Sequence, residues 1–131
     1  MDKQEIAMLT ITPSYGPGPL IPKYRLRLTQ IGDEFLIEAM MQLGRSQSRK
    51  SFKVDKEAAN REILKLKQAK IPAFPESRLV CDGEHIELCI HGESADLTLG
   101  WWTAAPEGAE ALADFADWVR SIGWPEDADD D

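Results

Sequence analysis

The chain has 131 residues, 43% of them hydrophobic, and a net charge of −8. This length fits one domain, and this apolar content is too high for a disordered protein. No apolar run approaches the roughly 20 residues that a membrane-spanning helix needs, and the first residues lack the pattern of a signal peptide. We therefore expect one cytoplasmic domain over residues 1–124, two free thiols, and a disordered acidic tail over 125–131.

The first predicted elements are a strand over 5–12 and, after a loop rich in proline and glycine, a hairpin that turns at Gly32-Asp33. A two-residue turn there pairs positions whose numbers sum to 65. Arg27 then faces Glu38 on one side of the hairpin as an ion pair, and apolar pairs occupy the other side. The apolar pairs are Leu28–Ile37, Leu26–Ala39 and Tyr24–Met41. Such an arrangement is typical of a half-buried antiparallel ladder.

The middle of the chain predicts a polar connection at 44–48, a short strand at about 50–54 and a helix over 56–69. Asp55 stands where a helix N-cap is needed, and apolar residues recur at helical spacing behind it. Two prolines follow the helix and end it.

The last third predicts a second hairpin that turns at Asp82-Gly83, because this dipeptide is a strong hairpin signal. Its second strand covers about 84–91, and another strand follows at about 96–103. A final helix starts at Pro106, which a first turn tolerates, and Gly123 caps its end.

This order of elements predicts an α+β fold. Sequential hairpins favour one antiparallel sheet of about five to seven strands, with the two helices on one face.

Charge divides by position along the chain. Residues 1–80 carry 14 basic against 9 acidic residues, whereas residues 81–131 carry one basic residue, Arg120, against 14 acidic ones. So acidic a second half repels phosphate backbones and anionic membranes and attracts cationic surfaces. We therefore expect a basic protein partner, and neither a nucleic acid nor a membrane. The expected partner-binding residues are Glu87, Trp102, Glu110, Asp114 and Asp117.

Trp101 and Trp102 point to opposite faces because they are adjacent in a strand. If Trp101 packs under the helices, Trp102 lies on the open face of the sheet near Glu87, where it can anchor an interface. Equally, a loop could cover Trp102.

Cys81, His85, Cys89 and His91 lie close together in the sequence. In a strand, His85 and His91 are roughly 20 Å apart and cannot bind one ion, and two neighbouring ligands do not make a structural zinc site.

The chain also lacks a nucleophile elbow and a phosphate-binding loop. We expect no metal, no cofactor and no catalysis. The alternative is a small hydrolase or ligand-binding enzyme on the open sheet face, with Glu87, His85 or His91 transferring protons.

A basic stretch lies beside Phe52 and could contact a nucleic-acid backbone. It comprises Arg45, Arg49, Lys50, Lys53 and Lys56. Since no RNA-binding signature accompanies it, the favoured interpretation is a solvated segment that offsets the acidic half.

Several short strings resemble small bacterial immunity proteins, which neutralise toxins delivered between competing bacteria. These strings are Ile71-Pro72-Ala73-Phe74-Pro75-Glu76, Cys81-Asp82-Gly83, Gly100-Trp101-Trp102 and Pro106-Glu107-Gly108. The resemblance covers roughly residues 50–122 and implies a non-catalytic acidic protein that docks on a cationic toxin effector and blocks it.

A third hypothesis is an adaptor that self-associates through an exposed strand edge.

Overall fold

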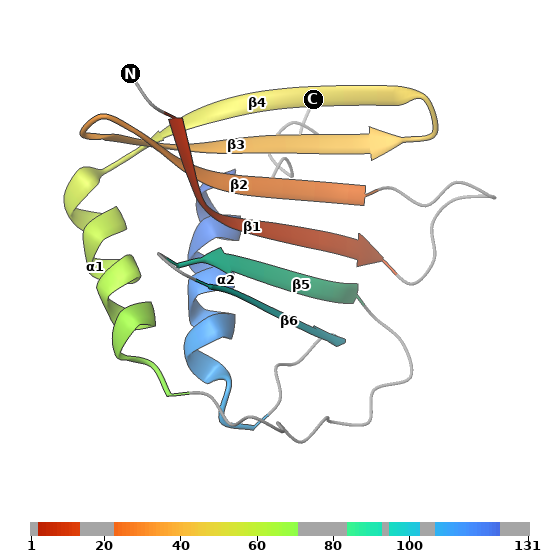
Figure 1. Cartoon of the computed structure of the whole chain (residues 1–131). Coiled ribbons are helices and arrows are strands. Elements are labelled where there is room, and N and C mark those ends of the chain that lie inside the picture. Colours follow the sequence, from red (N-terminus) through yellow and green to blue (C-terminus); the bar gives the residue numbers. More distant parts are fainter. Residues whose placement is uncertain (1–2, 14–22, 71–83, 93–94, 103–106, 124–131) are drawn as a thin grey trace.

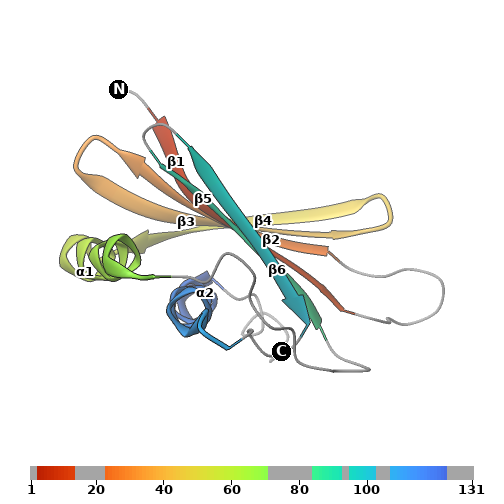
Figure 2. The same ribbon diagram turned by 60° about the horizontal axis from the view of Figure 1, so that its bottom comes forward.

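The computed structural model describes residues 3–13, 23–70, 84–92, 95–102 and 107–123. Its elements are β1 (Lys3–Pro13), β2 (Lys23–Ile31), β3 (Glu34–Leu43), β4 (Ser46–Val54), α1 (Lys56–Gln68), β5 (Glu84–His91), β6 (Asp96–Trp102) and α2 (Glu110–Gly123). Within the described residues, six strands form one antiparallel sheet in the order β4-β3-β2-β1-β5-β6. Both helices lie against the same face of that sheet (Figure 1, Figure 2). The α+β prediction is confirmed.

The first strand lies inside the sheet, because β1 pairs with β2 on one side and with β5 on the other. The strands from the basic first part of the chain, β2 to β4, therefore continue to one edge. The strands that follow α1 continue to the opposite edge. This order places the two parts of the chain side by side across β1 (Figure 1).

The core lies between the sheet and the two helices. Strand residues alternate between this buried face and an open face. Fully buried side chains of the sheet meet the apolar stripe of α2, and Trp101 joins the same cluster. The central members are Leu9, Ile11, Leu26, Leu28, Ile37, Leu88, Leu112, Phe115 and Val119. At the edge of the helix layer, Leu97 on β6 is 44% exposed.

The hairpin at Gly32-Asp33 has the predicted register, with Leu28 opposite Ile37 and Arg27 opposite Glu38. Gly32 has a φ of 61°, a conformation that tight hairpin turns require and glycine readily adopts. The ion pair predicted between Arg27 and Glu38 is wrong, because β1 supplies other partners. Arg27 forms an ion pair with Glu5, and Glu38 forms one with Lys3, whose Nζ lies 3.0 Å from Oε1 of Glu38.

Strand β4 begins at Ser46, so the polar connection predicted at 44–48 is wrong. A tight turn at Gly44-Arg45 leads directly into β4, which pairs with β3 from Leu43–Ser46 onward. Strand β4 is an edge strand whose first six residues are exposed. Burial therefore imposes no apolar alternation on these first residues, and the sequence pattern indicated only the second half of β4, the strand predicted at about 50–54.

Helix α1 matches its prediction, with the Asp55 carboxylate accepting a hydrogen bond from the amide of Ala58 at 3.0 Å. Helix α2 begins at Glu110, later than predicted. The reason is Gly108, whose φ of 92° is incompatible with a right-handed helix. The carbonyl of Ala109 accepts the first bonds of the helix. The predicted loop at 14–19, the hairpin turn at Asp82-Gly83 and the tail at 125–131 lie outside the described residues.

Candidate binding surfaces

Helix α2 presents a row of acids on the side away from the sheet. Glu110, Asp114 and Asp117 follow at intervals of four and three residues, which places them on one face of a helix. All three are exposed, whereas Leu112, Phe115 and Val119 on the opposite side are buried. The carboxylate of Glu110 also accepts a hydrogen bond from the amide of Gly108 at 3.1 Å. These three predicted partner-binding residues therefore share one exposed surface of α2.

Arg120 lies on the same helix as the acidic row but does not pair with it through the ion pairs described. Its guanidinium forms a two-point ion pair with Glu84 on β5, with nitrogen–oxygen distances of 2.9 and 2.7 Å. The one basic residue after position 80 is thus directed to the sheet. Within the part of the chain that the structure describes, Asp114 and Asp117 have neither an ion pair nor a hydrogen bond.

Helix α1 packs beside α2 and carries lysines, yet it does not neutralise the row. Its ion pairs are internal, since Lys65 and Arg61 both contact Glu62. No ion pair joins α1 to α2 among the described side chains. Among the described side chains, α1 therefore supplies no ion pair to Asp114 or Asp117.

The other two predicted partner-binding residues lie on the opposite, open face of the sheet. Trp102 is 47% exposed, and its ring meets His85 edge-on with 5.0 Å between ring centroids. Of the two alternatives for this tryptophan, exposure on the open face is the one observed. Glu87 is half-buried on the neighbouring strand, opposite Gly100. The five predicted residues therefore form two groups on two faces of the molecule.

The two histidines of β5 lie apart, as their spacing requires. His91 contacts Glu5 through Nε2 and Asp96 through Nδ1. Both hydrogen bonds raise the pKa of His91 above its usual value, and the one with Glu5 has the larger effect. The two carboxylates bind opposite nitrogens of the ring and leave no common point for a metal ion. His85 and Glu87 lie on the same face of β5, outside this cluster.

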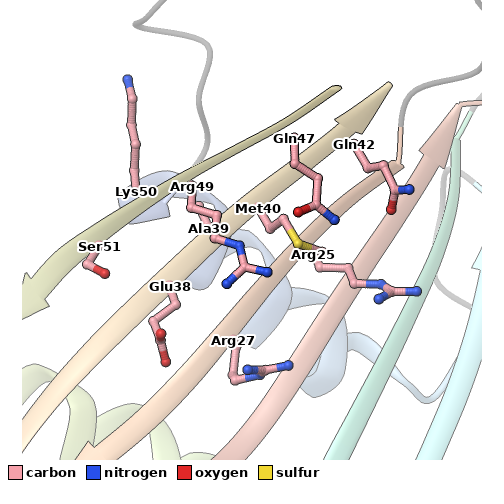
Figure 3. Close-up of a pocket in the computed structure, with 10 residues that line it drawn as sticks. All are labelled: Arg25, Arg27, Glu38, Ala39, Met40, Gln42, Gln47, Arg49, Lys50 and Ser51. Carbon is pink, nitrogen blue, oxygen red and sulfur yellow. The ribbon is translucent and has the colours of Figure 1, made fainter. Parts of the chain in front are cut away.

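An open depression of about 330 Å³ lies on the same open face, over β2, β3 and β4 (Figure 3). Arg25 and Arg49 stand on either side of Met40 in one row across the sheet, because Met40 pairs with both. Arg27 lies two residues along β2, on the same face. Sequence reasoning missed this group, although the register of two successive hairpins determines the row.

No protein-family model and no curated protein sequence matches this chain. Neither α1 nor α2 is long and apolar enough to cross a membrane, and these are the two helices of the described residues.

Proposed function

We propose that this chain is a non-catalytic binding protein that docks a basic protein partner on the outer face of α2. The observation that carries the proposal is the pairing of Arg120 with Glu84, which leaves Asp114 and Asp117 exposed without a countercharge among the described residues. A surface of one charge accelerates encounter with a surface of the opposite charge and disfavours wrong partners.

The narrower form of the proposal follows from the resemblance over residues 50–122. In this form the chain is a cytoplasmic bacterial immunity protein, and its partner is a toxin effector whose cationic site it covers. An enzyme that binds phosphate-rich substrates presents such a cationic site. The exposed Trp102 and Glu87 belong to a second surface and are not required for docking on α2.

The test compares two pairs of charge reversals. Asp114→Lys with Asp117→Lys changes the acidic row. Glu34→Lys with Glu57→Lys changes the net charge equally at exposed acids that also have no ion pair within the described residues. Each form is used to capture proteins from a lysate of the source organism at low and high ionic strength, and captured proteins are identified by mass.

We expect a basic protein bound by the wild type and by the Glu34/Glu57 variant. It should be lost with the Asp114/Asp117 variant and weakened by salt. If its gene lies beside that of this chain, co-expression should protect cells from it. Capture that is equal for both variants, or insensitive to salt, contradicts docking on α2.

A further inference from the structure

The depression over β2, β3 and β4 is rich in hydrogen-bond donors. Arg25, Arg27 and Arg49 stand on it from two strands, and Gln42 and Gln47 pair at one end of it (Figure 3). Each guanidinium offers five N–H donors and accepts none. The floor between Arg25 and Arg49 is the thioether side chain of Met40.

The carboxylate that lines the depression already has partners. Glu38 is the one carboxylate among the residues that line the depression, and its oxygens receive Lys3 and Thr29 at 3.2 Å each. The pKa of Glu38 is lowered, mainly by the hydrogen bond from Lys3. This carboxylate therefore stays charged and keeps Lys3 and Thr29 as its partners. Arg25 and Arg49 have no ion pair or hydrogen bond within the described residues.

Arg27 is also incompletely satisfied. Its Nε lies beside a Glu5 oxygen as an ion pair, but the N–H does not point at that oxygen and forms no hydrogen bond in the described part of the chain. Glu5 offsets the charge of Arg27, whereas Arg25 and Arg49 have no ion pair within the described residues and repel each other unless a negative charge lies between them. The arrangement therefore favours an anion with several oxygens.

The number and placement of the donors distinguish between kinds of anion. A carboxylate is planar and is matched by one guanidinium fork. A phosphoryl group has three acceptor oxygens and up to two charges, which suits donors that approach from two strands and from both sides of Met40. The volume, about 330 Å³, also leaves room for an organic part and lies at the lower end of small-ligand pockets.

We propose that this depression binds the phosphoryl or pyrophosphoryl group of a small molecule, with Arg25 and Arg49 on either side of it. The site is separate from the acidic face of α2 and independent of the function proposed above. Repulsion of phosphate is expected of the acidic second half of the chain, whereas this depression gathers arginines of the basic first part.

Calorimetric titration with pyrophosphate, at constant ionic strength, tests the site. The variants are Arg25→Gln and Arg49→Gln. The matched control is Lys53→Gln, which removes a charge from the same face of β4 outside the depression. Loss of a hydrogen bond to a charged group weakens binding by about tenfold or more. We expect that loss for each arginine variant and a change of about twofold or less for the control.

Amide NMR shifts during the titration should move first at β2, β3 and β4. Because Arg49 is exposed, Arg49→Gln is expected to fold whatever becomes of Arg25→Gln. Three outcomes would overturn the proposal. They are titration without saturation, equal weakening by Arg49→Gln and Lys53→Gln, and acetate binding as tightly as pyrophosphate, which would indicate a carboxylate site.

Discussion

Replacing Gly123 with alanine should destabilise the fold, because α2 rests on the sheet at this glycine. A Cβ atom there would lie 2.6 Å from Cγ2 of Ile37 and 2.9 Å from Cδ2 of Leu26. Carbon atoms pack best about 3.5–4.0 Å apart, so the methyl group would be about 1 Å too close to Ile37. Ile37 is β-branched and fully buried, so it cannot rotate away.

The magnitude follows from two opposing effects. Overpacking of a core by one methyl group costs about 1–3 kcal/mol. Alanine in place of glycine in a helix recovers up to about 1 kcal/mol, and less at a terminal residue. We therefore expect Gly123→Ala to lower the free energy of unfolding by about 1–2 kcal/mol, measured by urea denaturation.

A matched control is Gly100→Ala on β6. Its Cβ would lie 3.1 Å from the His85 ring, which is the end of a side chain that can turn aside. This variant should be within about 0.5 kcal/mol of the wild type. A Gly123→Ala protein as stable as the wild type would refute the close seating of α2, and with it the fixed position of the acidic row.

Two further changes test the cap of α1 and the His91 cluster. Asp55→Ala removes the carboxylate that accepts from Ala58, and should cost about 1 kcal/mol in urea denaturation; no loss would show that water replaces the cap. Glu5 and Asp96 raise the pKa of His91, so the stability gained from its protonation is full below the ordinary value of 6.5 and is lost as pH rises through the raised pKa. The difference in thermal midpoint between wild type and His91→Gln should therefore be larger at about pH 6 than at about pH 8.5, and a difference independent of pH contradicts this interpretation.

Local signals in the sequence predicted the elements that depend on local chemistry. The turn at Gly32-Asp33 determined the register of β2 and β3, and Asp55 marked the start of α1. A two-residue turn and an N-cap involve only residues within a few positions of each other. The start of α2 was misplaced because the backbone conformation of Gly108 is not evident from its neighbours.

Pairings between distant segments could not be predicted in the same way. Nothing near β1 indicates that it pairs with β5 as well as β2, and this pairing brings Glu5 to His91. The pairing of β1 with β2 brings Glu5 to Arg27, which therefore does not pair with its predicted partner Glu38. For the candidate surfaces, the acidic row on α2 was visible as helical spacing. The arginine depression required the registers of three strands together.

The sheet and the helix layer explain why a net charge of −8 describes neither surface. The strands β2 to β4 turn their arginines to the open face. Helix α2 lies on the other side of the sheet (Figure 2), and its acids are exposed on its outer side. A helix with its side chains is about 10 Å thick, which already exceeds the screening length of about 8 Å at physiological salt. The acidic row therefore exerts little repulsion on an anion in the depression. It follows that Asp114→Lys with Asp117→Lys should leave the affinity for pyrophosphate within about twofold of wild type. A larger gain would mean that the two faces act as one electrostatic surface.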